Sequence, residues 1–351
     1  MTATRFLNGL AIALILGVNP GLTVARGEAN APAASGKSQW VHFDSDGQLV
    51  YKPLERGDRI MDFSFAGYMG GGVALPSVPA KITLNPSGGD DTVAIQEAIE
   101  AVSKMELVDG FRGAVLLKPG TYNCSRTLAL TASGVVLRGS GSGTNGTILK
   151  MVGEPHLCLS LSGAGHLQRL GTPIPITDTY VPSGTDTFHV RDISGLKAGD
   201  LILVSRPVTA TWVHFMGMDT LVRDGRKETW LAAGGQIESE RVIKAIADNQ
   251  VMLNIPLADS IDAQYLKPPG GTIVRGARSG CISQVGVESL RILAPAQVVE
   301  IAQKHHQAIR MKDLTDAWLR DIAIEDTVDS VGIGSGTGRV TVECVTVRHS
   351  V

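Results

Sequence analysis

The sequence GGDDTVAIQEAIEAV at residues 88–102 is followed by GAVLLKPGTY at 113–122 and by SGVVLRGSGSGTNGTIL at 133–149. The first stretch predicts an amphipathic helix, because its apolar residues recur three and four positions apart and so share one face. These residues are Ile95, Ala98, Ile99 and Val102. Asp90 or Asp91 is placed to cap the first free amides of that helix. The other stretches each hold a short apolar run that ends at a Gly-containing turn, which predicts strands in quick succession.

These motifs resemble the opening of the pectate lyase superfamily, in which GDDTxAIQxAI, GGxVxLPxGTY and GVxLxGxG follow one another. Here they are Gly89 to Ile99, Gly113 to Tyr122 and Gly134 to Gly141. The resemblance implies an all-β fold, a right-handed parallel β-helix with an N-terminal capping helix. It implies little about the reaction, because lyases, hydrolases, epimerase-like proteins and phage tailspikes share this scaffold.

The composition agrees with tightly turned β structure. The 351 residues are 43% hydrophobic and include 41 glycines, whereas aromatic residues make up only 5%. This glycine share exceeds the usual value of about 7%. The formal net charge of -2 favours neither a nucleic-acid-binding protein nor a membrane-surface protein, since both usually carry a concentrated basic excess.

The first residues predict a secretory signal peptide over 1–29. Arg5 precedes an apolar stretch from Phe6 to Val18, and small residues follow up to a cleavage point near Ala25 or Ala29. The apolar core is too short to span a bilayer comfortably, although a retained N-terminal anchor is the alternative. Residues 30–38 are small and polar and predict a disordered leader. We therefore expect a secreted or periplasmic protein with no membrane contact after signal cleavage.

A late internal repeat predicts further coils. VESLRI at 287–292, LRDIAI at 319–324 and VECVTV at 342–347 share one apolar pattern, and they begin 32 and 23 residues apart. Such repeats bury their apolar positions only by stacking on their neighbours. The last repeat runs to the end of the sequence without a cap, which favours a truncated chain or a fragment of a longer protein.

A segment between the early and late coils breaks this rhythm. Val242–Ile246 and Val251–Leu257 predict a hairpin through the Asp248-Asn249 turn. We therefore expect an inserted small β-barrel or sandwich. The resulting division is into N-terminal coils with the capping helix over 39–175, the insert over 176–275 and further coils over 276–351.

Two motifs are better explained by structure than by ligand binding. Gly141, Gly143 and Gly146 spell GxGxxG, but the strand-like TILKM at 147–151 follows where a nucleotide-binding helix would begin, so no nucleotide site is expected. The four cysteines lack metal-ligand spacing and are expected to be buried and unpaired rather than joined by disulfides; they are Cys124, Cys158, Cys281 and Cys344.

The densest set of titratable residues at repeat positions lies in the late coils. Lyases of the resembled family need an Arg or Lys base and a Ca²⁺ held by carboxylates, whereas hydrolases need two or three carboxylates. The expected catalytic residues are Asp321, Glu325, Asp329 and Arg348. The expected substrate-binding residues are Trp212, Trp230, Arg320 and His349. Calcium is the cofactor that the lyase alternative would require, and no metal ligands are assigned.

Several of these residues also have a structural interpretation. With an offset of 23 residues, Glu325 stacks under Arg348 and Asp326 under His349, which would form ordinary cross-strand ion pairs. Trp212 and Trp230 lie in the less regular middle of the insert, where they would form its core or stack on sugars.

The resemblance thus favours a secreted lyase or hydrolase that acts on an acidic, pectin-like polysaccharide. The alternatives are a non-catalytic glycan-binding or adhesion β-helix protein and an inactive fragment of a longer enzyme. A polysaccharide is the expected partner in each active case, and nucleic acids and nucleotides are not expected.

Overall fold

The structure is a computed structural model that describes residues 38–228, 230–300 and 302–350. The expected signal peptide and the leader up to residue 37 lie outside the described residues. Within the described ranges, no helix combines the length and the apolar character that a membrane crossing requires.

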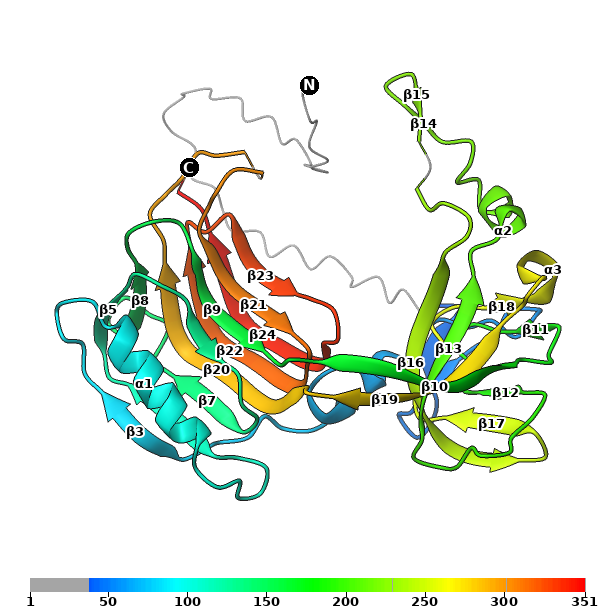
Figure 1. Cartoon of the computed structure of the whole chain (residues 1–351), viewed down its shortest axis with the longest axis horizontal. Helices are drawn as coiled ribbons and strands as arrows, with labels where there is room; N and C mark the ends of the chain where they lie inside the picture. The colour runs from blue at the N-terminus through cyan, green and yellow to red at the C-terminus, as the bar shows by residue number, and fades with distance from the viewer. Residues whose placement is uncertain (1–37, 229, 301, 351) are drawn as a thin grey trace, which may run out of the picture. The chain divides into compact units, whose positions relative to one another are not determined.

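Two parts of the chain, before and after an insert, form one parallel β-helix (Figure 1). The strands before the insert are β3 (Ala80–Leu84), β4 (Gly113–Leu117), β5 (Gly120–Cys124), β6 (Leu128–Leu130), β7 (Val135–Arg138), β8 (Thr147–Met151) and β9 (Leu157–Ser162). Those after it are β20 (Ile282–Leu293), β21 (Gln307–Lys312), β22 (Leu314–Glu325), β23 (Asp329–Ile333) and β24 (Gly338–Arg348). One parallel sheet has the order β24-β22-β20-β7-β4-β3, with β8 joining β5 to β20, and another has the order β23-β21-β9-β6. The expected all-β, parallel β-helix fold is confirmed.

Helix α1 (Thr92–Ser103) covers the start of this stack, and the predicted apolar face is buried. Of the two candidate capping residues, Asp90 accepts a hydrogen bond from the Thr92 amide at 3.0 Å. Its other carboxylate oxygen accepts one from Ser125 Oγ at 2.5 Å, just beyond β5. The hydrogen bonds from Ser125 and Thr92 hold the pKa of Asp90 at about 2, so this carboxylate joins the helix to the first coil.

The pairing of the late strands confirms the repeat. Val287 of β20 pairs with Leu319 of β22, which in turn pairs with Val342 of β24. The inward residues of β20 and β22 are fully buried in the core of the β-helix. The two offsets read from the sequence are therefore the lengths of successive coils.

Each of these long strands bends twice at a residue with positive φ. The first bend is at Gln284, Asp316 and Arg339, with φ of 59°, 53° and 54°. The second is at Ser289, Asp321 and Cys344, with φ of 56°, 54° and 53°. Each set occupies equivalent positions in adjacent coils, because the residues on either side are paired. Asp tolerates this left-handed conformation better than most residues, so the bends account for an Asp at two of these positions.

A row of small residues on the outer face of the large sheet accommodates one tryptophan. Ala114, Val136, Gly286 and Trp318 pair across four neighbouring strands. A Cβ on Gly286 would lie 2.2 Å from Trp318 Cε2, so only glycine leaves room for the indole. Tyr68 packs edge-on against this ring, with the two ring centroids 5.3 Å apart. This contact places the segment before β3 on the sheet.

An antiparallel subdomain interrupts the β-helix between β9 and β20. Its longer strands are β10 (His166–Pro175), β12 (Thr187–His189), β13 (Leu201–Pro207), β16 (Gln236–Ala247), β17 (Gln250–Leu253) and β19 (Thr272–Ser279), in the sheet order β10-β19-β13-β16-β17-β12. Its short elements are β11 (Tyr180–Val181), α2 (Ala210–Phe215), β14 (Val222–Arg223), β15 (Arg226–Lys227), β18 (Ile261–Asp262) and α3 (Ala263–Leu266). The predicted hairpin is β16–β17, and its turn residues Asp248 and Asn249 both have positive φ.

The antiparallel sheet begins earlier and ends later than the expected limits of 176 and 275. The reason is that β10 and β19 pair with each other from His166 and Ser279 onward. The subdomain has a core of its own, formed around Phe188, Ile202 and Val251, which shares no residue with the β-helix core.

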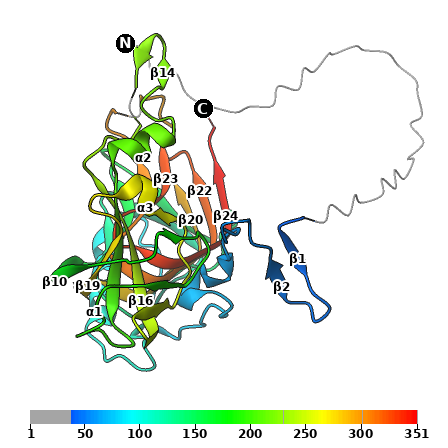
Figure 2. The ribbon, with the colours of Figure 1, turned by 90° about the vertical axis from the view of Figure 1, so that its right-hand side faces the viewer.

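Short elements precede β3. Strands β1 (Val41–Phe43) and β2 (Leu49–Tyr51) form a hairpin (Figure 2), and two short 3-10 helices follow, η1 (Phe63–Phe65) and η2 (Tyr68–Gly70).

All four cysteines are free thiols. Cys124 and Cys158 are buried as expected, whereas Cys281 is only half-buried and Cys344 is exposed.

Replacement of Gly286 by alanine should lower the stability of the β-helix. The added Cβ would overlap Trp318, and such overpacking costs about 1–3 kcal/mol. The midpoint of urea unfolding measures this loss. Gly338→Ala is the matched control, because nothing lies within 4 Å of a Cβ placed there. An equal shift for both variants would contradict the account of the Trp318 row.

Candidate functional site

The predicted residues of the late coils lie on three strands. Arg320, Asp321 and Glu325 belong to β22, Asp329 begins β23, and Arg348 ends β24. His349 follows β24 and is exposed. Asp329 therefore belongs to the smaller parallel sheet, while the others belong to the larger one.

A small pocket brings two of these residues together. Its lining includes Ser142, Arg291, Glu325, Thr346 and Arg348, and its volume is about 180 Å³. Glu325 and Arg348 pair across β22 and β24, as the 23-residue offset predicts. The pocket is smaller than the roughly 300–1,000 Å³ of sites that enclose a small molecule.

The predicted ion pair between Glu325 and Arg348 is wrong. The Glu325 carboxylate instead binds Nη1 of Arg291, one coil earlier, at 2.6 Å. Arg291 is positioned to bind Glu325 because its Nε donates a hydrogen bond to the Ser142 carbonyl at 3.1 Å, which holds the guanidinium in place. Arg348 is exposed, and its guanidinium has no ion-pair or hydrogen-bond partner among the described residues.

Asp321 and Asp326 are occupied by neighbouring groups. Asp321 accepts a hydrogen bond from Ser142 Oγ at 2.5 Å. The Asp326 carboxylate accepts one from the amide of Ser350 at 2.6 Å, so the expected pairing with His349 is not formed. Asp321 thus ties a bend of β22 to the Gly-rich loop before β8.

Arg320 binds a buried carboxylate. Glu288 of β20 has a side chain only 1% exposed, and it accepts from Arg138 and Arg320 at 2.5 Å each. Trp318 Nε1 also donates to it, at 3.2 Å. A buried carboxylate requires such compensation, so this guanidinium is committed to the coil stack.

Asp329 belongs to a histidine-rich corner before β21. Its carboxylate accepts from His305 Nε2 at 3.0 Å, and this hydrogen bond raises the pKa of His305. The adjacent His306 is 2% exposed and packs edge-on against His156 at 5.3 Å. Burial, and then the neighbouring His156, lower the pKa of His306. The two adjacent histidines thus have different partners.

The predicted carboxylates do not form a calcium site. In the part of the chain that the structure describes, no three His, Cys, Asp or Glu side chains are grouped so that they could hold a metal ion. Asp321 binds Ser142, Glu325 binds Arg291 and Asp329 binds His305. A Ca²⁺ ion prefers six to eight oxygen ligands, which this arrangement does not provide.

The two candidate tryptophans differ in their surroundings. Trp212 of α2 is half-buried against the core of the insert, and the Arg206 guanidinium stacks over it at 4.1 Å. Trp230 is 81% exposed. Trp212 thus has the structural role that the sequence allowed, and Trp230 retains an open face on which a sugar could stack.

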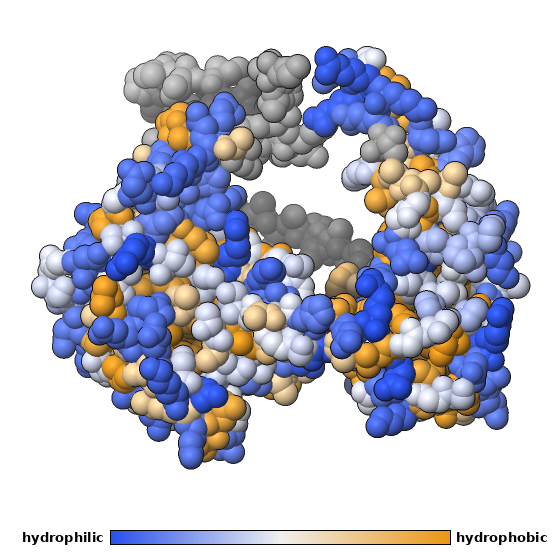
Figure 3. All heavy atoms as spheres, in the orientation of Figure 1, coloured by the Kyte–Doolittle hydropathy of each residue, from blue (hydrophilic) through white to orange (hydrophobic). Residues whose placement is uncertain are grey.

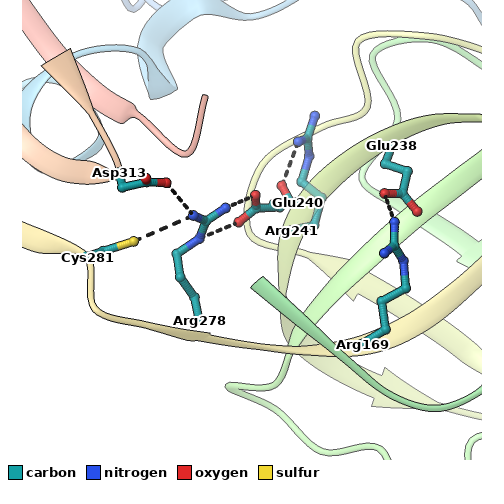
Figure 4. Close-up of polar contacts among 7 residues, drawn as sticks. All are labelled: Arg169, Glu238, Glu240, Arg241, Arg278, Cys281 and Asp313. Carbon is teal, nitrogen blue, oxygen red and sulfur yellow. Dashed lines mark hydrogen bonds and ion pairs between the residues drawn. The ribbon is translucent and has the colours of Figure 1, made fainter. Parts of the chain in front are cut away.

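The structure reveals a carboxylate pair in the insert that the sequence did not indicate. Glu238 and Glu240 lie two positions apart on β16, so they share a face of the sheet. Arg169 binds Glu238 at 2.5 Å, and Arg278 binds Glu240 (Figure 4). Arg278 also lies 3.9 Å from Asp313, beside β22. With a guanidinium on each carboxylate, this network connects the insert to the β-helix and offers no free acid–base pair.

Three residues that make these contacts were not predicted from the sequence: Arg291, Ser142 and Glu288. Arg291 lies within VESLRI, and the repeat offset could have placed it diagonally opposite Glu325. Ser142 could not be found in this way, because its neighbours in space lie beyond the insert. Hydrophilic and hydrophobic residues are interspersed over the visible face of the β-helix (Figure 3).

The fold defines a parallel β-helix protein with an antiparallel insert. No family model matches the chain, and neither does a curated protein. Similar solved structures include the tailspike gp49 of Pseudomonas phage LKA1, with 14% identity, a TM-score of 0.35 and coverage of 73% of this chain and 44% of that one. The tailspike gp61 of Pseudomonas phage phi297 has 12% identity, a TM-score of 0.35 and coverages of 74% and 42%.

A third similar structure is the gp54 tailspike of Acinetobacter baumannii bacteriophage AP22, solved in complex with A. baumannii capsular saccharide. It has 8% identity, a TM-score of 0.29 and coverages of 73% and 48%. The chain thus spans less than half the length of these tailspikes. At such low TM-scores, the fold assignment rests on the strand pairing itself, and the pectate lyase relationship remains a prediction from the sequence motifs.

Asp329→Asn should lower the free energy of unfolding more in acid than in base. The folded pKa of His305 is raised above its ordinary 6.5, so its pair with Asp329 stabilises the fold below that pH. This contribution is lost as the pH rises through the folded value. Urea unfolding of the wild type and of Asp329→Asn, at about pH 5.5 and about pH 8.5, should therefore show the larger loss of unfolding free energy at the lower pH. Glu97→Gln, which alters an exposed carboxylate, is the control; an equal loss at both pH values would contradict the assignment.

Proposed function

We propose that this protein works outside the cytoplasm and binds an acidic polysaccharide along the late coils of its β-helix. The observation that carries the proposal is the exposed Arg348 guanidinium at the edge of a pocket in which Glu325 is already neutralised by Arg291. The three charged side chains leave an excess of one positive charge. A uronate or another acidic sugar carries the carboxylate that would complement it.

The open form of the site supports recognition of a chain rather than of a free sugar. The pocket is small, and the parallel strands around it present equivalent positions in successive coils. Arg291 is held by a backbone carbonyl and Glu325, so it is preorganised for contact with a ligand. Arg348 can turn freely toward a sugar carboxylate.

Binding is better supported than cleavage. β-Elimination needs a base and a group that stabilises the developing carbanion, and hydrolysis needs one protonated and one ionised carboxylate. The carboxylates of Asp321 and Glu325 are instead engaged by Ser142 and Arg291. We therefore place lyase or hydrolase activity second, with Asp321, Glu325 and Asp329 as its candidate residues.

Arg348→Ala should weaken the binding of polygalacturonate. Loss of an exposed charge-assisted contact predicts a dissociation constant roughly three- to tenfold higher, with a smaller effect at high salt. Affinity electrophoresis or calorimetry measures this, with dextran as the neutral polymer. Arg226→Ala is the matched control, because Arg226 is an exposed residue of the β14–β15 hairpin.

The same preparations distinguish binding from cleavage. Release of unsaturated or reducing ends by the wild type, lost in Glu325→Gln while binding persists, would move the proposal from a binding protein to an enzyme. Equal affinity for polygalacturonate and dextran, or unchanged affinity in Arg348→Ala, would overturn the proposed acidic-glycan site.

A further inference from the structure

A second and larger pocket lies beside the first coil and shares no lining residue with the pocket at Arg348. Its volume of about 740 Å³ falls within the range of roughly 300–1,000 Å³ that is typical of small-molecule sites. Its walls come from residues 76–81, which lead into β3, and from residues 104–113, which connect α1 to β4. Neither wall is part of the proposed polysaccharide site.

The floor of this pocket is apolar and held in place from below. Val78 is buried, and Phe111 packs edge-on against Trp318 with ring centroids 6.2 Å apart. Met105 packs against the core of the β-helix. Because the floor residues are anchored in this way, the cavity does not require rearrangement of the β-helix before a ligand enters.

A tight turn forms one wall. Val108 and Phe111 exchange backbone hydrogen bonds of 2.8 and 2.9 Å. Between them, Asp109 and Gly110 have φ of 52° and 86°, the conformation of a type I′ turn. The turn exposes Val108, which is 67% accessible, toward solvent at the pocket edge. This wall is therefore preformed and carries apolar surface that is not otherwise covered.

The fixed charge of the pocket is positive. Half-buried Arg112 donates from Nε to the Ser133 carbonyl at 3.1 Å and from Nη1 to the Met105 carbonyl. Among the described residues, no carboxylate pairs with it, and the two carbonyl groups do not cancel its charge. Lys81 and Lys104 add two exposed cations, against the exposed acids Glu106 and Asp109. A half-buried guanidinium without a carboxylate attracts an anion more strongly than exposed charges do.

From this arrangement, we infer that the pocket binds a small amphipathic anion, in which one carboxylate or sulfonate is attached to an apolar aliphatic or aromatic body. The anionic group contacts Arg112 with help from Lys81 and Lys104. The apolar body lies on Met105, Val108 and Phe111, with the buried Val78 beneath them. This site is independent of the polysaccharide proposal, since it uses other residues and another class of ligand.

The test uses the whole chain and the fluorescent probe anilinonaphthalene sulfonate, an anion with an apolar aromatic body. We expect saturable binding to one site, from which dodecanoate displaces the probe and dodecyltrimethylammonium does not. Lys81→Glu should raise the dissociation constant by about threefold to tenfold. Lys227→Glu makes the same charge change on the exposed strand β15 and should leave binding unchanged.

A second variant tests the cavity without changing its charge. Ser77 is exposed and lines the pocket, so Ser77→Trp should fill the entrance and abolish specific binding, while polygalacturonate binding stays as in the wild type. Arg112 is left intact because it also satisfies two carbonyl groups, and its replacement would mix folding with binding. Equal displacement by the anionic and cationic amphiphiles, or probe binding that Ser77→Trp does not reduce, overturns the inference.

Discussion

The parallel pairing of β20 is the constraint on which the rest of the β-helix depends. This strand pairs with β7 and β8 on one side and with β22 on the other, so it joins the coils before the insert to those after it. Two features make its register specific. The buried Glu288 must meet Arg138 and Arg320, and Gly286 must lie under Trp318. A shift by one residue would turn these side chains to the opposite face of the strand. Because desolvation offsets much of the attraction in a buried ion cluster, its main effect is to penalise wrong registers.

The insert interrupts this stack without disturbing it because its ends lie side by side. β10 leaves the β-helix and β19 returns to it as an antiparallel pair, so the chain exits and re-enters at one place. The two cores share no residue, and Arg278 links the two parts through Glu240 and Asp313. Such an arrangement allows β20 to pair directly with β7 and β8, although the insert separates them in the sequence. The β-helix and the insert thus each bury apolar side chains in a cluster of their own.

Local and periodic features were predictable, whereas the choice of ionic partners was not. The buried face of α1, the offsets of the repeats and the β16–β17 hairpin all follow from spacings within short segments. The partner of Glu325 depends on which of two guanidinium groups is held in place by a distant loop. The carbonyl of Ser142 positions Arg291, and nothing in the repeat pattern reveals this contact. Asp321 shows a related difficulty, since the sequence cannot separate an acid placed for chemistry from one placed at a bend with positive φ.

The contrast between Arg320 and Arg348 shows how the coil stack determines which charges remain available. Both residues lie on late strands that the repeat predicts. Each stands opposite an acidic residue of the preceding coil in the strand register, Arg320 opposite Glu288 and Arg348 opposite Glu325. Glu288 is buried, so it holds Arg320 firmly. Glu325 is more accessible and is already bound by Arg291, so pairing with Arg348 would add little. A cation in this fold therefore becomes available for a ligand when the acid beside it is accessible to solvent and is already bound by a better-positioned cation.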